Sequence, residues 1–152
     1  MNTLEIREIF KHVDWFDGVY PSDRPLVINA LPASFIINTD EAHLPGQHWV
    51  ALYIDEAGHG EYFDPYGLPP FKLNILDNLN NICINWKYNK CTIQSTSARS
   101  TACGHLCAVY IVLKHHNFSM EEICCIFDES GNQNDKMAMS VVNKHMKTYM
   151  RL

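Results

Sequence analysis

The octapeptide Ser100-Thr-Ala-Cys103-Gly104-His-Leu-Cys107 opens an apolar stretch that runs to residue 113, and this combination decides the fold. The apolar stretch is typical of a buried helix, and either hydroxyl residue at the start of the octapeptide, Ser100 or Thr101, is expected to cap it. Cys103 then falls in the first turn, where the helix dipole and unpaired backbone N–H groups favour a thiolate. A thiolate beside Gly104, which has no side chain, is typical of a cysteine nucleophile. The alternative is that Cys103 is a small buried hydrophobic residue.

The composition indicates one globular domain. The chain has 152 residues, of which 47% are hydrophobic and 19% charged, enough to bury a core. Its net charge is −5 and its Lys and Arg residues do not cluster, so strong nucleic-acid binding is not expected. No apolar run approaches the ~20 residues of a membrane span, and residues 1–8 do not resemble a signal peptide. We therefore expect a single domain, residues 1–152, in the cytosol or nucleus.

The cysteines are expected to be reduced. They are Cys83, Cys91, Cys103, Cys107, Cys124 and Cys125. An even number would allow disulfides, but disulfides are uncommon without a secretory signal. The chain has no Cys-x-x-Cys pair and no matching His pair, so no metal is expected. A structural zinc protein is a weak alternative that metal analysis would test.

Hydrophobic periodicity predicts an α+β domain. The expected helices are 3–11 with Thr3 as its cap, 71–80, 103–116 ended by Asn117, 120–127 and 136–150. The expected strands are 26–29, 34–38, 48–54, 61–63 and 91–94, and the expected loops are 13–25 and 128–135. The strand 48–54 is apolar enough to be buried on both faces, and it forms a hairpin with 61–63 through the turn 55–58. This order predicts a central sheet flanked by helices.

Three polar residues stand where these elements begin or end. His48 starts the apolar strand, Asp64 ends its hairpin partner, and Cys103 starts the central helix. A hairpin with a short turn places His48 and Asp64 at the same end of the sheet. A carboxylate can then orient one imidazole nitrogen while the other faces the sulfur. Singly, His48 could be a strand-edge histidine and Asp64 a turn residue.

An oxyanion donor is needed beside the Cys103 backbone N–H. Gln94 lies in the segment that leads to Cys103 and is the side-chain candidate, the alternative being a surface amide.

Three motifs resemble those of the adenain family, the maturation proteases of adenoviruses, and their Polinton-type relatives. They are Leu44–Trp49, Tyr62–Gly67 and residues 100–107, and 16–20, 36–39 and 134–135 also resemble family stretches. The resemblance implies a papain-like, adenain-like fold with a small mixed sheet and the nucleophile at the start of the central helix. It implies that His48 is the general base, that Asp64 orients it and that Cys103 is the nucleophile, with no required cofactor.

The resemblance does not decide which residue forms the oxyanion hole. The family commonly places its glutamine six or seven residues before the cysteine, whereas Gln94 stands further away. Either a short insertion still delivers Gln94, or the backbone alone forms the hole. Trp49 is expected to support the oxyanion loop, to serve as a core aromatic residue, or both.

The resemblance also implies an activating peptide, tethered through a disulfide in adenain. Cys83 or Cys91 could be the tether, the alternative being ordinary thiols. DNA also activates adenain, but the acidic net charge argues against strong activation here.

The predicted function is that of a cysteine endopeptidase. By resemblance it processes viral or mobile-element capsid precursors at Gly-containing sites, in the host nucleus or cytoplasm or packaged in the virion, with no membrane partner. One alternative is a SUMO- or ubiquitin-specific protease of the same clan, which usually has Asp where Ala102 stands. Another is a catalytically inactive module that binds peptides.

Overall fold

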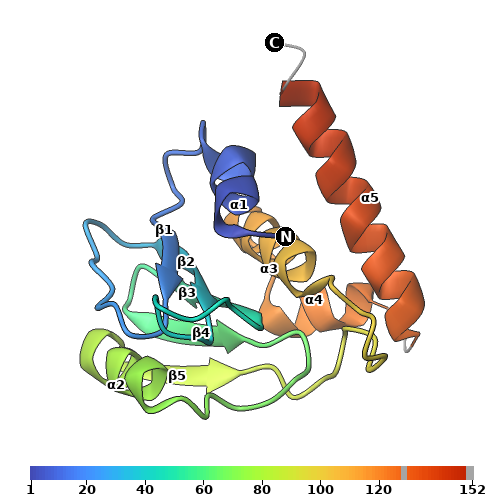
Figure 1. The fold of residues 1–152 in the computed structure, drawn as a ribbon. Helices are drawn as coiled ribbons and strands as arrows, with labels where there is room; N and C mark the ends of the chain where they lie inside the picture. The colour runs from blue at the N-terminus through green and yellow to red at the C-terminus, as the bar shows by residue number, and fades with distance from the viewer. Residues whose placement is uncertain (128–129, 150–152) are drawn as a thin grey trace.

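The structure, a computed structural model, describes residues 1–127 and 130–149 and places a five-stranded sheet among five helices (Figure 1). In chain order the elements are α1 (Thr3–Phe10), β1 (Gly18–Pro21), β2 (Ala33–Asn38), β3 (Trp49–Ile54), β4 (His59–Phe63), α2 (Leu73–Ile82), β5 (Asn85–Tyr88), α3 (Cys103–His115), α4 (Met120–Ile126) and α5 (Gly131–Tyr149).

The sheet is mixed and its strands lie in chain order, β1-β2-β3-β4-β5. The three central strands are antiparallel, whereas β1 runs parallel to β2 and β5 parallel to β4. The hairpin β3–β4 pairs Ala51 with Phe63 and Leu52 with Tyr62. The predicted α+β fold with a small mixed sheet is therefore confirmed, as is the hairpin.

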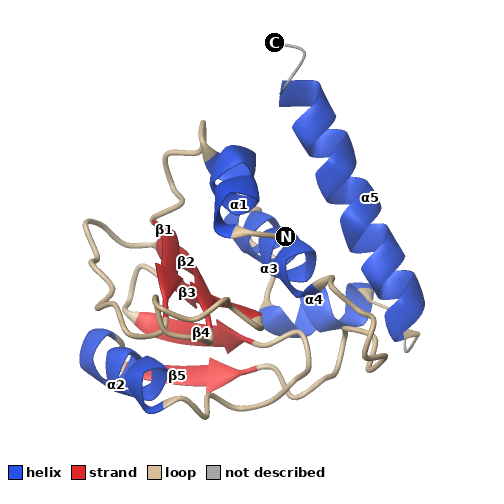
Figure 2. Ribbon diagram, viewed as in Figure 1, coloured by secondary structure: helices blue, strands red, loops and turns tan. Residues whose placement is uncertain are grey.

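Two hydrophobic cores cover the two faces of the sheet, because successive side chains of a strand point to opposite faces. Ile36, Ala51 and Phe63 pack with α1, α3, α4 and α5. Phe35, Val50, Leu52 and Tyr62 face the other way and pack with α2. Figure 2 shows this division, with α2 on its own beside β5 and the other helices grouped together. The prediction that the central strand is buried on both faces is confirmed.

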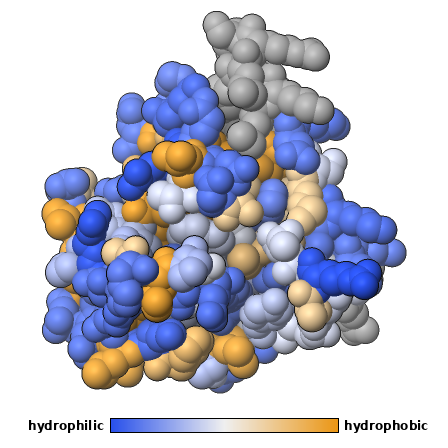
Figure 3. Space-filling model, viewed as in Figure 1, coloured by the Kyte–Doolittle hydropathy of each residue, from blue (hydrophilic) through white to orange (hydrophobic). Residues whose placement is uncertain are grey.

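The surface is mostly hydrophilic in the view of Figure 3, where hydrophobic residues form small separate groups. Scattered apolar residues of this kind are ordinary on a soluble domain. Within the described ranges, no helix combines the length and the apolar character needed to cross a membrane.

Helix α3 begins with the buried residue Cys103 and packs in the core. It begins at Cys103 and ends before Asn117, whose φ of 65° stops it as predicted. Most of its residues are buried, and the Cys107 thiol donates to the Trp49 carbonyl of β3 over 3.3 Å. The start of α3 is thereby held against the start of β3.

Several predicted elements are wrong, because tertiary pairing overrides local pattern. Residues 18–21 form strand β1 inside an expected loop, since β2 offers them a parallel partner. Residues 26–29 form no strand, and the Leu26 N–H binds the side chain of Asn78 instead. Residues 91–94 are irregular, while the strand lies earlier, at Asn85–Tyr88.

The predicted helix starts also need correction. Asn2 caps α1 through a capping box with Glu5, in place of Thr3. The N-cap of α3 is Ala102, which offers no side-chain cap, so neither predicted hydroxyl serves. Helix α5 starts at Gly131, five residues before its predicted start, so most of the expected loop 128–135 is helical, while residues 128–129 and Met150 lie outside the described residues.

A disulfide joins Cys91 to Cys124, so the prediction of reduced thiols is wrong for these two residues. They are 33 residues apart in the chain, and only the docking of α4 near the segment after β5 brings them together. The free cysteines are Cys83, Cys103, Cys107 and Cys125.

Replacing Cys124 with serine is expected to lower the free energy of unfolding by about 2–4 kcal/mol, because the disulfide restricts the unfolded chain. Denaturant titration in non-reducing buffer measures this change, and reduced wild-type protein should match the variant. An equal loss of stability on replacing Cys125, which is exposed and free, would contradict the assignment.

Candidate active site

The hairpin β3–β4 brings His48 and Asp64 together, as the sequence predicts. The His48 ring Nε2 lies 2.8 Å from Oδ1 of Asp64, which is 1% exposed. Because Nε2 faces the carboxylate, Nδ1 is the ring nitrogen left to face Cys103. The Tyr66 ring stacks on the His48 ring with centroids 4.9 Å apart, which fixes the plane of the imidazole.

The backbone and one carboxylate oxygen of Asp64 are hydrogen-bonded to neighbouring residues, and the other carboxylate oxygen is not. Its Oδ1 also accepts from the Tyr66 backbone N–H over 2.8 Å. The Asn89 side chain accepts from the Asp64 N–H over 2.8 Å and donates to the Asp64 carbonyl over 2.7 Å. The other carboxylate oxygen, Oδ2, is buried without a hydrogen-bond partner among the described residues. The carboxylate is thus aimed at His48 with little freedom to turn away.

The pKa shifts of Cys103 and His48 are those expected of a thiolate beside an imidazolium. Burial alone would lower the pKa of His48, but hydrogen bonds and charge from Asp64 and Cys103 outweigh it and raise that pKa to about 9. Burial alone would raise the pKa of Cys103, but His48 and the backbone of Trp49 and Gly104 lower it. The pair therefore favours thiolate and imidazolium, the reactive state of a cysteine nucleophile.

Trp49 lies against the start of α3. Its backbone contributes to the lowered pKa of Cys103, and its indole Nε1 donates to the Met1 carbonyl over 2.9 Å. A Cβ placed on Gly104 would lie 3.1 Å from both Trp49 and Met1. These two residues therefore fill the space on the side of Gly104 where a side chain would stand.

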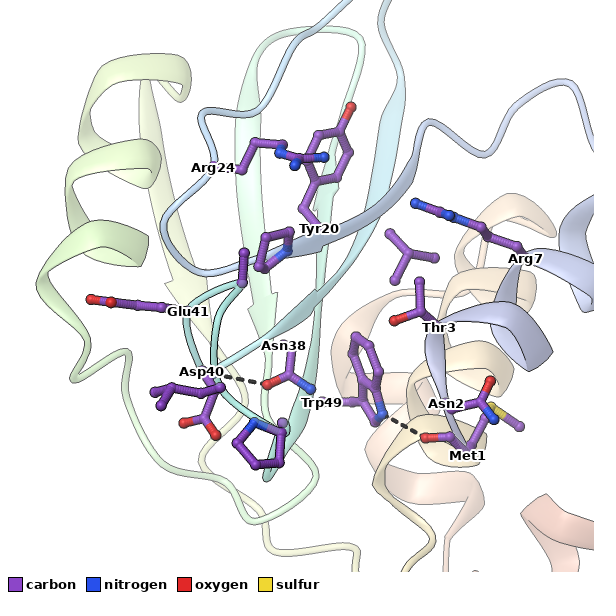
Figure 4. Close-up of a pocket in the computed structure, with 16 residues that line it drawn as sticks. Met1, Asn2, Thr3, Arg7, Tyr20, Arg24, Asn38, Asp40, Glu41 and Trp49 are labelled. Atoms are coloured by element: carbon purple, nitrogen blue, oxygen red, sulfur yellow. Dashed lines mark hydrogen bonds between the residues drawn. The ribbon is translucent and has the colours of Figure 1, made fainter.

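A surface hollow of about 340 Å³ opens beside Trp49 (Figure 4). The figure shows Met1, Asn2 and Thr3 from the start of α1 on one side, and Asn38 and Asp40 across from them. Its charged lining residues are Arg7, Arg24, Asp40 and Glu41. The hollow is thus lined by polar and apolar residues alike and is open to solvent, and Trp49 is the lining residue that also contacts the start of α3.

Gln94 is buried near the start of α3. It is 2% exposed, and its Nε2 donates to the Ser100 hydroxyl over 2.9 Å. Ser100 in turn donates to Oδ2 of Asp135 in α5 over 2.7 Å. Gln94 is therefore no surface amide, and it belongs to a hydrogen-bonded chain that reaches the last helix.

The two candidate tether cysteines offer no exposed free thiol. Cys91 is bonded to Cys124, and Cys83 is buried, which raises the pKa of its thiol to about 11. Cys125 is the exposed free cysteine of the described residues. In the same residues no three His, Cys, Asp or Glu side chains gather as they would around a metal ion.

Sequence reasoning missed four residues that shape the site. Tyr66 lies in the motif Tyr62–Gly67, and its role becomes visible only from its stacking on the His48 imidazole. Asn89 lies 25 residues after the aspartate it holds, and no spacing pattern predicts that contact. Ser100 was expected only as a helix cap, and Asp135 only as part of a resembling stretch.

A cysteine paired with a histidine at the start of a helix, beside a mixed sheet, is the arrangement typical of cysteine proteases. Residues 16–150 match the family described as adenovirus endoprotease, so the chain belongs to that family. No curated protein matches the chain in a sequence comparison.

Two solved structures are similar to this fold. The central domain of an uncharacterized Legionella pneumophila protein aligns with a TM-score of 0.55 and 14% identity, over 100% of this chain and 98% of that one. The ASFV pS273R protease aligns with a TM-score of 0.45 and 24% identity, over 69% of this chain. The alignment spans 42% of the length of that protease.

Proposed function

We propose that this cysteine protease is an endopeptidase that uses Cys103 as nucleophile, His48 as general base and acid, and Asp64 to orient the imidazole. The observation that carries the proposal is the 2.8 Å contact of His48 Nε2 with the buried Asp64 carboxylate, with Cys103 at the start of α3 as the partner of the same imidazole. In keeping with this geometry, the pKa of Cys103 is lowered while that of His48 is raised to about 9. An isolated histidine and an isolated buried thiol would show the opposite shifts.

In the proposed reaction the Cys103 thiolate attacks the carbonyl carbon of the scissile peptide bond. The resulting oxyanion is stabilised by the Cys103 backbone N–H and by the Gln94 amide. Protonated His48 donates its proton to the leaving amine as the C–N bond breaks, which leaves a thioester on Cys103. His48 then takes a proton from water, which attacks the thioester and releases the acid and the thiolate.

The proposed substrate is a capsid precursor cut after small residues such as glycine. Trp49 and Met1 pack closely against Gly104, the residue after the nucleophile, and we propose that this packing narrows the approach for a bulky acyl-side residue. The hollow beside Trp49 is the proposed place for the substrate residues that precede the cleaved bond (Figure 4). We place the reaction in the host nucleus or cytoplasm or in the virion, without a required cofactor. We also propose, from the family resemblance, that a peptide activator can raise the rate of this reaction.

The test is labelling with a peptide vinyl sulfone ending in Gly-Gly, followed by mass mapping of the modified cysteine. We expect selective modification of Cys103 at neutral pH, slowed about 10²-fold or more in His48→Ala because the thiolate loses its counter-ion. His59→Ala is the matched control, since His59 is exposed and faces Asp55 at the other end of the hairpin.

Equal, slow labelling of every accessible cysteine would contradict the proposal and would favour an inactive peptide-binding module. A panel of SUMO and ubiquitin conjugates tests the substrate class. Cleavage of these conjugates in preference to Gly-Gly capsid peptides would assign the enzyme to the other branch of the clan.

A further inference from the structure

We propose that Asp135 of α5 is a positioning residue for the oxyanion hole, acting through Ser100 on Gln94. The inference rests on the proposed function, because it explains how the Gln94 amide is oriented for the reaction described above. It assigns the last helix of the fold a part in catalysis, although that helix carries no member of the triad.

Asp135 contacts the segment 94–100, which contains Gln94 and leads to Cys103. Its side chain is 8% exposed, and its Oδ2 accepts from the Ser100 hydroxyl over 2.7 Å. Its Oδ1 accepts from the Ser95 backbone N–H over 3.2 Å. Both carboxylate oxygens are thus used on the segment that precedes Cys103, one at Ser95 and the other at Ser100.

The start of α5 is built to approach this segment closely. A Cβ on Gly131 would lie 2.6 Å from Cα and 2.7 Å from N of Ser95, closer than real Cβ atoms come. Asn134 donates to the Ile93 carbonyl over 3.0 Å, so the helix is also bonded to the residue before Gln94. The close approach allowed by glycine brings Asp135 within reach of Ser100.

The carboxylate determines which way the Gln94 amide points. A hydroxyl has one proton, and an ionised carboxylate can only accept, so Ser100 must donate to Asp135. The Ser100 oxygen is then left to accept, and only the NH₂ end of Gln94 can donate to it. The relay therefore selects one of the two orientations of the amide, and the proposal assigns the second Nε2 hydrogen to the oxyanion.

The orientation costs a hydrogen bond elsewhere. Oε1 of Gln94 is buried without a partner among the described residues, a loss that ordinarily disfavours such a placement. This orientation of Gln94 is the one that the proposal requires, because the NH₂ group and not Oε1 must donate to the oxyanion. Backbone bonds from Ile93 and Gln94 to the Pro65 carbonyl, both 2.9 Å, tie the same segment to the turn after Asp64.

Asp135→Asn is expected to lower kcat for a Gly-Gly peptide about 10–100-fold and to change KM less than about threefold, because one oxyanion donor is misplaced. The Ser95 N–H still requires an acceptor, so the new NH₂ group faces Ser100. Ser100 then becomes free to donate to Oε1 of Gln94, and the amide turns over. Ser100→Ala should act in the same direction, and Ser100→Thr, which keeps the hydroxyl, should restore most of the rate.

A second readout separates positioning from general damage to the fold. Alkylation of Cys103 by iodoacetamide forms no oxyanion, so its rate depends on the Cys103–His48 pair alone. We expect Asp135→Asn to alkylate within about twofold of the wild type while hydrolysing peptide poorly. Adding Asp135→Asn to Gln94→Ala should cause little further loss, because both changes remove the same donor. The matched control is Asn132→Ala, which removes a hydrogen bond between α5 and Ser95 but leaves the Gln94–Ser100–Asp135 hydrogen bonds in place.

The outcomes distinguish this inference from the proposed function. If wild-type Cys103 is neither selectively labelled nor active, the proposed function fails. If the wild type is active but Asp135→Asn lowers alkylation and hydrolysis together, or lowers activity equally in the Gln94→Ala background, Asp135 is only structural and the inference fails. Unchanged hydrolysis in Asp135→Asn would overturn the inference as well.

Discussion

Replacing Cys103 with alanine is expected to abolish peptide hydrolysis, with a loss of at least about 10⁴-fold, while leaving the protein folded. The loss follows because no other group can form the thioester once the sulfur is gone. Alanine has high helix propensity and removes a single atom at the start of α3, so the melting temperature should change by only a few degrees. Hydrolysis of a Gly-Gly peptide and thermal unfolding of the same preparation measure the two effects.

The matched control for this experiment is Cys125→Ala. Cys125 is an exposed free cysteine in α4, so its replacement should leave the rate unchanged. Cys103→Ser provides a second variant that keeps the shape of the side chain if alanine destabilises the fold. Substantial hydrolysis by the Cys103→Ala variant would show that the nucleophile lies elsewhere, whereas Cys103→Ser retains a hydroxyl beside His48 and should be strongly impaired.

Asp64→Asn is expected to lower kcat/KM about 10²-fold at neutral pH and to shift the alkaline limb of the pH profile downward. The position of Oδ1 receives two N–H donors, from His48 and from Tyr66, so the amide oxygen should occupy it. The histidine tautomer is then preserved and only the negative charge is lost. The expected loss is therefore smaller than in triads where this substitution also selects the wrong tautomer.

The sign of the pH effect follows from the two shifted groups. Activity requires the Cys103 thiolate, which is present above its lowered pKa, and the His48 imidazolium, which is lost as the pH rises through about 9. The wild-type profile should therefore be bell-shaped with its alkaline limb near pH 9. Without the Asp64 charge the pKa of His48 falls, so the alkaline limb should move toward neutral pH.

The profile of kcat/KM against pH for wild type and Asp64→Asn measures this shift. Asp55→Asn is the control, since Asp55 faces the exposed His59 at the far end of the same hairpin and should leave the profile in place. An alkaline limb that stays near pH 9 in Asp64→Asn would show that Asp64 does not set the protonation of His48.

The positions of the three proposed triad residues could be predicted because each lies at the end of an element with a strong pattern. The apolar run of β3 and its short turn determine where β4 returns, and that register brings Asp64 to His48. The apolar run after Cys103 likewise predicts the central helix. Amphipathic spacing predicts α1, α2 and α4 to within about two residues of their observed bounds.

The supporting contacts could not be predicted in this way, because they join residues that no local pattern relates. Strand β1 pairs with a parallel neighbour, β2, whereas residues 26–29 form no strand and the Leu26 N–H binds the side chain of Asn78. The disulfide of Cys91 depends on where α4 docks, and Asn89 reaches Asp64 only after β5 has paired with β4. Helix α5 starts at Gly131, where the chain packs closely on Ser95. The polar sequence of 128–135 gives no sign of this contact.

The turn between β3 and β4 has a consequence for how this protein can change over evolution. It is closed by Asp55, whose Oδ1 accepts from the N–H groups of Ala57 and His59, and by Gly58 at a φ of 88°. One residue inserted there would shift the pairing of β4 by one position and turn Asp64 toward the opposite face of the sheet. The loop 40–47 carries no such pairing, and an insertion there would leave the ladder intact. Lineages of this fold can therefore remodel the rim of the hollow beside Trp49 by insertion and deletion, whereas the far end of the hairpin must keep its length.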